Sequence, residues 1–495
     1  MNIYMRIVRQ YGPWLVPALA ALAVGLARAG VPELWRDEVS SWSASGRRLG
    51  ELFALLRNVD ASNGAYYVLL HGWTQVFGDS PTALRLPSAL AMAGAAALTA
   101  LTARRLFASP VAGLAAGLLL ATIPQVSRYA QEARSYAVVT CAVAGATWCL
   151  LRALDRPGAG RWAGYALCTA AAGLFHLVAL SALVGQLPMV LLAARRPGRR
   201  ALLWQWPAAA TAGLLPTVPL ILLGHHQSGR QLSWLAAPTG RDLRFVWQDV
   251  FGSYHVLYTF LVLGLIALVW RPSSGAAVRL LAAAVLPVAV VWFVSRHGGT
   301  SYFLARYLLF TLPAWAALAG GGVGVLYALL PRAARRAPVA VALAVAVAAV
   351  PAWLGLDAQR ALRTAAGHTD TDYRGAAALV AAGYRPGDGL VTAGGAENWM
   401  MVGPAVAYYL PRSVRPQAMF VQESAVSADD LFPVECRVPA ACTGDGSRAW
   451  VVTIGTGSDP FRNLPAAQAL VLRTDFTPAE VRQIPGLTVS LLVRR

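Results

Sequence analysis

The sequence contains no lysine and little charge of any kind. Of its 495 residues only 13% are charged, whereas 57% are hydrophobic, and the mean hydropathy is +0.51. A soluble domain needs more polar surface than this, so the excess apolar side chains are expected to face lipid. The composition therefore indicates an integral membrane protein.

The positive charge comes from arginine alone and gives a formal net charge of +19. A nucleic-acid partner is one explanation, but the arginines follow hydrophobic runs in short clusters, which is the pattern of cytoplasmic loops. We therefore predict no nucleic-acid binding, a multi-pass protein of the cell membrane, a cytoplasmic N-terminus and an extracytoplasmic segment after 357. One alternation of sides fits all six clusters: Arg6 and Arg9; Arg104 and Arg105; Arg152, Arg156 and Arg161; Arg195 to Arg200; Arg271 and Arg279; Arg332, Arg335 and Arg336.

About eleven hydrophobic runs approach the roughly 17–25 residues that cross a bilayer. The polar break between 161 and 194 is slight, so this stretch is either two spans or one bent span. The first run lacks a clear small-residue cleavage site and is interpreted as a retained span. The runs are 12–30, 81–102, 109–126, 136–152, 161–177, 178–194, 202–223, 256–270, 278–295, 305–329 and 338–356.

Cysteine is also scarce, with five residues. Cys141, Cys149 and Cys168 lie in apolar runs and are interpreted as small buried hydrophobes. For Cys436 and Cys442 a short-range disulfide is favoured over two free thiols. No Cys/His spacing suggests a zinc site.

The predicted architecture is an all-α polytopic bundle over 1–356 followed by a small α/β domain over 357–495. Within the bundle, the first outer loop, 31–80, holds an amphipathic stretch at 49–57 and an aromatic stretch at 66–77, both typical of helices at the membrane surface. In the tail, helices are expected up to Ala382 and over 399–409, with strands at 390–392, 449–454 and 487–493.

The first candidate for chemistry is Trp35-Arg-Asp-Glu38, directly after the first run. Two adjacent carboxylates at a membrane boundary are costly unless they are solvated, paired or functional. Glycosyl transfer to a hydroxyl needs a base of this kind. The alternative is a helix-terminal cap at the water interface.

A second candidate is the segment from Ser127 to Tyr136, predicted to open a helix with Arg128, Glu132 and Ser135 near one face. Arginine offers paired donors to a phosphate, and tyrosine adds a hydroxyl. The alternative is an Arg–Glu pair at spacing i, i+4 on a solvated helix start.

The remaining candidates also lie in predicted outer loops. Arg306, beside Tyr307, is placed to reach a lipid phosphate, or to snorkel to ordinary headgroups. His176 is at an outer corner, where interfacial hydrogen bonding is the alternative to catalysis. Asp60 and Tyr66 offer contacts to sugar hydroxyls, although turn formation also explains Asp60.

Several motifs occur in an order that resembles the GT-C superfamily, in particular the branch of protein O-mannosyltransferases and the lipid A aminoarabinose transferase. The Pro-Gly-Asp388 segment and Tyr408-Tyr409 also resemble the outer domain of bacterial members. One departure is Ser62-Asn-Gly-Ala65, where family members often have a His-Pro-Pro-like segment. The motifs are Trp35-Arg-Asp-Glu38, Asp60, Ala65-Tyr-Tyr-Val-Leu-Leu-His-Gly-Trp73, Phe77-Gly, Leu84-Arg-Leu-Pro-Ser88, Gln131-Glu-Ala-Arg-Ser-Tyr136 and Arg306-Tyr307.

The resemblance implies a polyprenyl-phosphate sugar donor and transfer with inversion, on the outer face, to a cell-envelope glycan, glycolipid or protein. Asp37 would be the catalytic base, and Glu38 and Glu132 would bind or orient the acceptor. Arg134, Tyr136 and Arg306 would bind the donor phosphate. Arg128 is added to this group because of its residue type and its position. Further substrate-binding candidates are Asp60, Tyr66, His176 and Tyr307.

The predicted sugar is mannose or a pentose such as arabinose. No metal or other cofactor is expected, since arginines can neutralise a single phosphate. The alternatives are a lipid-linked-glycan transporter or flippase, which needs polar residues through the midplane, and a non-catalytic envelope scaffold.

Overall fold

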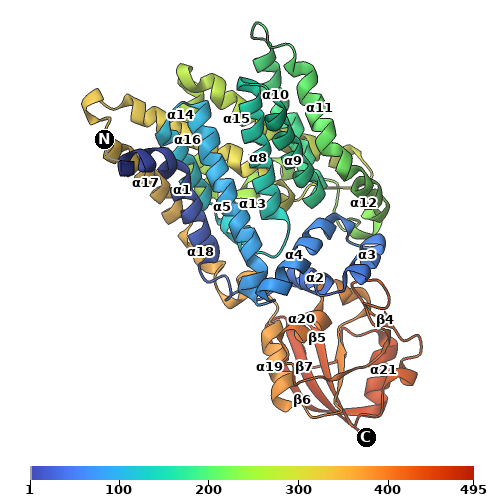
Figure 1. Cartoon of the computed structure of the whole chain (residues 1–495). Helices are drawn as coiled ribbons and strands as arrows, with labels where there is room; N and C mark the ends of the chain where they lie inside the picture. The colour runs from blue at the N-terminus through green and yellow to red at the C-terminus, as the bar shows by residue number, and fades with distance from the viewer. Residues whose placement is uncertain (1–2) are drawn as a thin grey trace. The chain divides into compact units, whose positions relative to one another are not determined.

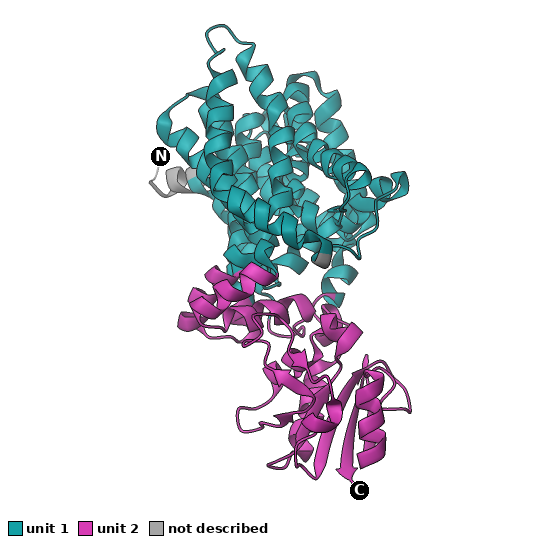
Figure 2. Cartoon of the chain, turned by 90° about the vertical axis from the view of Figure 1, so that its right-hand side faces the viewer, with its two compact units in different colours: residues 1–29, 60–66, 85–361 teal, residues 30–59, 67–84, 362–495 magenta. Residues whose placement is uncertain are grey.

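The computed structural model describes the backbone of residues 3–495 and the side chains of 11–229 and 231–495. The chain forms two compact units, shown in different colours in Figure 2. Unit 1 comprises 1–29, 60–66 and 85–361, and unit 2 comprises 30–59, 67–84 and 362–495. The sequence predicted one boundary near 357, whereas the compact units also divide the chain within the first loop.

Unit 1 is a bundle of helices (Figure 1), with shorter 3₁₀ segments at several corners. Seven of the described helices are long and apolar enough to cross a membrane, or up to nine if each of two bent pairs is one span. The helices are α1 (Ile3–Leu26), α5 (Pro81–Leu106), α6 (Pro110–Thr122), α7 (Pro124–Ala130), α8 (Tyr136–Asp155), α9 (Ala159–Phe175), α10 (Ala182–Ala194), α11 (Leu202–Leu214), α12 (Val218–Gln231), α13 (Gly240–Phe251), α14 (Tyr254–Val269), α15 (Arg271–His297), α16 (Leu312–Leu329), α17 (Ala337–Leu354) and α18 (Leu356–Ala361).

All the predicted hydrophobic runs are helical, but not every run is a single straight helix. The run 109–126 is divided between α6 and α7, which are bent by 70°. Ile123 is extended there because Pro124 follows it and disfavours helical backbone before it. The stretch 161–194 is two helices, since extended His176 and a 3₁₀ turn, η2 (Leu177–Ser181), separate α9 from α10.

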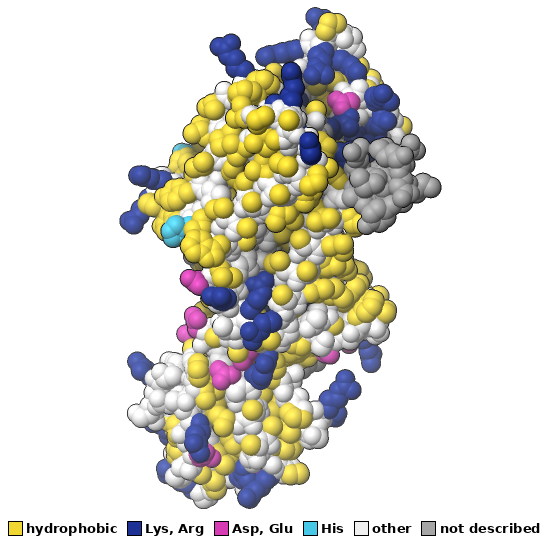
Figure 3. All heavy atoms as spheres, turned by 90° about the vertical axis from the view of Figure 1, so that its left-hand side faces the viewer, with side chains coloured by type: hydrophobic (Ala, Val, Ile, Leu, Met, Phe, Trp, Pro, Cys, Tyr) yellow, Lys and Arg dark blue, Asp and Glu magenta, His cyan; other side chains and the backbone are white. Residues whose placement is uncertain are grey.

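Some helices of the bundle approach closely at small residues, and many large apolar side chains are exposed. A Cβ atom added at Gly320 or Gly322 of α16 would collide with the backbone of α6 or α14. Such close approach is typical of helices that associate in lipid. Figure 3 shows hydrophobic side chains over a face of unit 1. The protein is thus a multi-pass membrane protein.

Unit 2 contains first-loop helices and an α/β fold. The loop helices are α2 (Arg36–Ser45), α3 (Leu49–Asn58) and most of α4 (Gly64–Phe77). A five-stranded sheet has the order β2-β1-β5-β7-β6; β2, β1 and β5 are parallel, and β7 runs antiparallel to both β5 and β6. The elements are α19 (Tyr373–Gly383), β1 (Gly389–Thr392), α20 (Val402–Tyr409), β2 (Gln417–Ala418), β3 (Val421–Glu423), β4 (Val434–Glu435), β5 (Arg448–Ile454), α21 (Ala466–Asp475), β6 (Phe476–Ile484) and β7 (Leu487–Arg494).

The sequence predicted the inner part of this domain better than its edge. Strands β1, β5 and β7 and helix α19 are confirmed, and the amphipathic stretch is α3, with Leu52 and Leu55 buried and Phe53 exposed. Strand β6 was missed because it is an exposed edge strand with a register shift after Pro478, so it lacks the alternation of a half-buried strand. The Cys436–Cys442 disulfide is confirmed.

Candidate functional site

In unit 2, the two adjacent carboxylates of the first loop lie in the first turn of α2. Trp35 precedes the helix in an extended conformation, and Asp37 and Glu38 follow at its N-terminal end, where the helix dipole favours negative charge. The side chain of Asp37 is 17% exposed and lies 3.7 Å from the guanidinium of Arg36. Asp37 therefore keeps an accessible carboxylate on a rigid helix start.

Glu38 has a different environment from its neighbour. Its side chain is fully buried, and its carboxylate lies 3.7 Å from Nδ1 of His368, which is also fully buried. The sequence offered Glu38 as an acceptor-binding group. The structure places this side chain against His368, and its acceptor role stays a prediction.

In unit 1, the helix considered for Ser127–Tyr136 does not continue through the segment. Helix α7 ends at Ala130, residues 131–135 form an irregular turn, and α8 begins at Tyr136. The Arg–Glu pair of the alternative interpretation is present: Nη1 of Arg128 lies 2.5 Å from a carboxylate oxygen of Glu132. Both side chains are largely buried, so Arg128 has a carboxylate partner within the chain.

Hydrogen bonds from distant segments hold this turn. The hydroxyl of Ser88 donates to the carbonyl oxygen of Glu132 at 2.6 Å, and the side-chain amide of Gln131 donates to the carbonyl oxygen of Ala27 at 2.7 Å. Ser88 and Gln131 belong to motifs that the sequence singled out, but no role was predicted for either. Their contacts assign them to support of the turn that carries Arg134.

Three rings that are far apart in the sequence form a cluster beside this turn. The centroids of His176 and Tyr307 are 4.5 Å apart, those of Tyr136 and His176 are 5.8 Å apart, and those of Tyr136 and Tyr307 are 6.1 Å apart. Tyr129 packs edge-on against Tyr136. The second and third candidate motifs and the predicted corner histidine therefore meet in one place.

Two arginines add positive charge to the ring cluster. The guanidinium of Arg306 lies 5.6 Å from the ring centroid of Tyr307. Burial and, to a lesser extent, the charges of Arg134 and Arg306 together lower the pKa of His176 to about 3. The imidazole is thus neutral at physiological pH, and the two cations beside it supply the positive potential of the cluster.

The ring cluster borders a cavity of about 470 Å³ inside unit 1. His176 and Tyr307 line it together with apolar side chains of η2, α12 and α15, such as Leu180, Ile221 and Val291. A cavity with an apolar wall and an aromatic end, whose His176 lies near the charges of Arg134 and Arg306, suits an amphiphilic ligand with an anionic head.

Two further candidates, Asp60 and Tyr66, make contacts within unit 1. Asp60 has a positive φ of 60°, and its carboxylate accepts a 2.6 Å hydrogen bond from the amide of Asn63, which is the turn that the alternative interpretation foresaw. Tyr66 is completely buried, with its hydroxyl 3.5 Å from that of Ser88. Over the described residues, no group of three or more His, Cys, Asp or Glu side chains is arranged to hold a metal ion.

Comparisons with known proteins agree with this arrangement. Residues 65–222 match the family model described as dolichyl-phosphate-mannose-protein mannosyltransferase. A search of the curated proteins finds no match. Among solved structures, ArnT from Cupriavidus metallidurans bound to undecaprenyl phosphate has a TM-score of 0.64 at 16% identity, covering 97% of this chain and 98% of that one. The apo state of the same protein gives 0.61 and 16%, with 97% of each chain covered.

The chain therefore has the fold of ArnT, and the family model adds a local similarity to dolichyl-phosphate-mannose-protein mannosyltransferases over residues 65–222.

Proposed function

We propose that this protein transfers a sugar, mannose or a pentose such as arabinose, from a polyprenyl-phosphate donor to a glycan, lipid or protein of the cell envelope. The observation that carries the proposal is the cationic ring cluster of Arg134, Arg306, Tyr136, His176 and Tyr307 at the border of an apolar cavity. The undecaprenyl phosphate bound in the ArnT structure supports the lipid class of the donor.

The two parts of such a donor correspond to the two parts of the cavity. The isoprenoid chain would lie along the apolar side chains of η2, α12 and α15. The phosphate would accept charge-assisted hydrogen bonds from Arg134 and Arg306, and the Tyr136 hydroxyl would donate another. Arg128, which Glu132 already engages, contributes less to this charge.

In the proposed reaction, Asp37 is the general base. Its carboxylate takes the proton of the acceptor hydroxyl as that oxygen bonds to the anomeric carbon, and the bond from that carbon to the phosphate oxygen breaks. The polyprenyl phosphate leaves with the electron pair, and the arginines stabilise the charge that develops on it. A single displacement of this kind inverts the anomeric centre.

The same proposal assigns the sides of the membrane and the domains. Arginine-rich short loops support a cytoplasmic N-terminus and an α/β tail outside. The bundle over 1–356, with the loop 31–80, would be the catalytic domain, and 357–495 would be an outer domain.

The decisive experiment is the variant Asp37→Asn, which keeps the shape of the side chain and removes its basicity. Purified protein in nanodiscs would be given radiolabelled polyprenyl-phosphate sugars and a cell-envelope extract. Transfer should fall at least about 10²-fold with unchanged thermal unfolding, since general bases contribute roughly 10²–10⁴-fold. Asp357→Asn, at a fully exposed carboxylate, is the matched control. Full activity of the Asp37 variant would remove it from the mechanism.

A further inference from the structure

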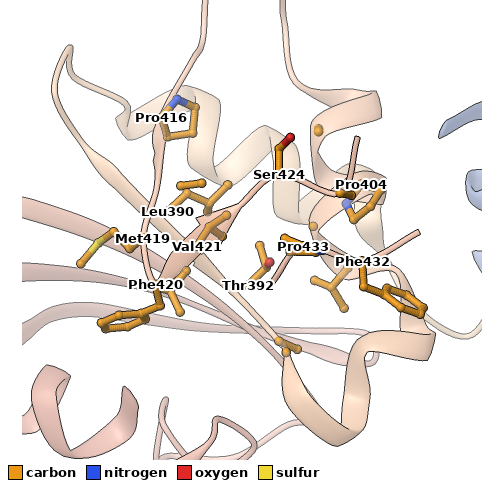
Figure 4. A pocket seen from close by; sticks show the side chains of 18 of the residues that line it. Leu390, Thr392, Pro404, Pro416, Met419, Phe420, Val421, Ser424, Phe432 and Pro433 are labelled. Carbon is orange, nitrogen blue, oxygen red and sulfur yellow. The ribbon is translucent and has the colours of Figure 1, made fainter. Parts of the chain in front are cut away.

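A second cavity lies within the α/β domain of unit 2, at the carboxyl ends of parallel strands β1 and β2. Its volume is about 580 Å³, in the range of small-molecule sites. Figure 4 shows Leu390 and Thr392 of β1 with Pro404, Val421 and Phe432 around it. We refer to this cavity as the outer crevice.

The topology of the sheet makes this position a favourable one for a ligand. Strand β1 has β2 on one side and β5 on the other, and the chain leaves β1 first toward β2 and later reaches β5. In open α/β sheets, ligands bind outside the carboxyl ends of the strands where the order of connections reverses. The outer crevice lies at such a point.

The turn after β1 shows which ligand chemistry is disfavoured. Gly394 and Gly395 follow the strand directly, as glycines do where a backbone turn cradles a phosphate. Here the backbone N–H of Gly395 donates a 2.7 Å hydrogen bond to Glu435, and a Cβ at Gly394 would collide with the same carboxylate. The chain therefore fills the anion position of the turn with its own side chain.

The same carboxylate provides acceptors for a hydroxyl ligand. Its second oxygen accepts a 2.8 Å hydrogen bond from the amide of Gln468, which is 4% exposed and so fixed in position. These bonds use one acceptor site on each oxygen, whereas a carboxylate has about four. An acyl chain in the crevice would desolvate the carboxylate without bonding to it, whereas hydroxyl groups would satisfy it.

We propose that the outer crevice binds a neutral sugar ring, with its hydroxyls on Glu435 and Thr392 and its apolar face on Phe432 and Pro404. Assigning this sugar to the acceptor rests on the proposed function; binding itself does not. The outer domain would then bind one sugar of the acceptor glycan, while a different part of the acceptor receives the transferred sugar.

The test uses the full chain in nanodiscs and saturation-transfer NMR with methyl glycosides of neutral hexoses and pentoses. Glucose 1-phosphate and octanoate serve as the anionic and acyl probes. Pro404→Trp fills the crevice, Phe432→Ala removes the ring without overfilling, and Leu470→Trp, on the exposed face of α21, is the matched control.

At least one neutral glycoside should bind the unaltered chain and the Leu470 variant, and bind about tenfold or more weakly to both crevice variants. Glycoside binding that survives Pro404→Trp and Phe432→Ala, binding of the phosphate or octanoate probe alone, or no glycoside binding would each overturn the inference.

The inference and the proposed function fail separately. Asp37→Asn should leave glycoside binding intact. Crevice-dependent binding without sugar transfer from any donor would contradict only the proposed function. Transfer without crevice-dependent binding would contradict only the inference.

Discussion

The hydroxyl of Ser88 and the carbonyl oxygen of Glu132 are 2.6 Å apart and hydrogen-bonded, although 44 residues separate them. The bond connects α5 to the turn that carries Arg134. It is completely buried, so the carbonyl has no water to replace the lost donor. A mutation at Ser88 therefore tests whether this bond positions Arg134 for a donor phosphate.

Ser88→Ala should lower both stability and donor affinity. Leaving a buried carbonyl without its donor costs about 1–3 kcal/mol, and a displaced Arg134 should raise the donor KM with little change in kcat. Thermal unfolding and donor-dependent kinetics measure the two effects. The control is Thr99→Val, which removes a buried hydroxyl bonded only to the carbonyl of Ala95 within its own helix; an equal rise in donor KM there would contradict the positioning role.

Arg306→Gln should weaken the donor without unfolding the protein. A charge-assisted hydrogen bond contributes about 1.5–3 kcal/mol, so the donor KM should rise roughly tenfold or more, with partial recovery in Arg306→Lys. Arg360→Gln, at a side chain that is 71% exposed, is the control for lost charge. If Arg134 and Arg306 share one phosphate, their double variant should be less impaired than the product of the single effects; strict additivity would contradict a shared ligand.

The sequence was informative where a pattern is local. Hydrophobic runs predicted the helices because each run must satisfy its own backbone in lipid. The motifs identified Tyr136, Arg306 and Tyr307 as candidates, and the structure places these residues around His176.

It was uninformative where a role depends on distant partners. Nothing in the sequence near Glu38 signals that its carboxylate is fully buried against His368, 330 residues later. The support by Ser88 was equally hidden, since a serine beside Pro87 in an apolar run is usually a helix residue bonded to its own backbone. Figure 1 separates these segments by colour along the chain.

Glu33 predicts a pH dependence of stability in unit 2. Burial, opposed by the hydrogen bond from the backbone N–H of Arg374 and reinforced by the negative charge of Asp372, raises its pKa from 4.5 to about 7. Tyr373 and Tyr409 are titratable groups that also interact with Glu33. Because the folded state holds the proton more tightly than the unfolded chain, this contribution is fully present below about pH 4.5 and is lost as pH rises to about 7.

Glu33→Gln, a mimic of the protonated acid, should therefore unfold at a higher temperature than the unaltered chain at pH 8 and at a similar temperature at pH 4.5. Thermal unfolding across that range is the measurement. Glu480→Gln, at an exposed edge-strand carboxylate, should not reproduce the difference. The same pH slope with and without the Glu33 carboxyl would show that another group is responsible.

The Cys436–Cys442 disulfide should stabilise the outer domain by limiting its unfolded state. It closes a loop with a sequence separation of 6, for which chain entropy gives about 2 kcal/mol. The bridge directly follows Glu435, whose carboxylate holds the turn after β1. Dithiothreitol should therefore lower the unfolding temperature of this domain and loosen the turn, which hydrogen exchange at the Gly395 amide would detect.

The double variant Cys436→Ser/Cys442→Ser separates the bridge from the reagent. It should unfold at the temperature of the reduced chain and show no further change with dithiothreitol, because Cys141, Cys149 and Cys168 are already free thiols. A reagent effect that persists in the double variant would place the sensitivity outside the bridge. An unfolding temperature equal to that of the oxidised chain would mean that native-state strain offsets the entropy the bridge removes from the unfolded chain.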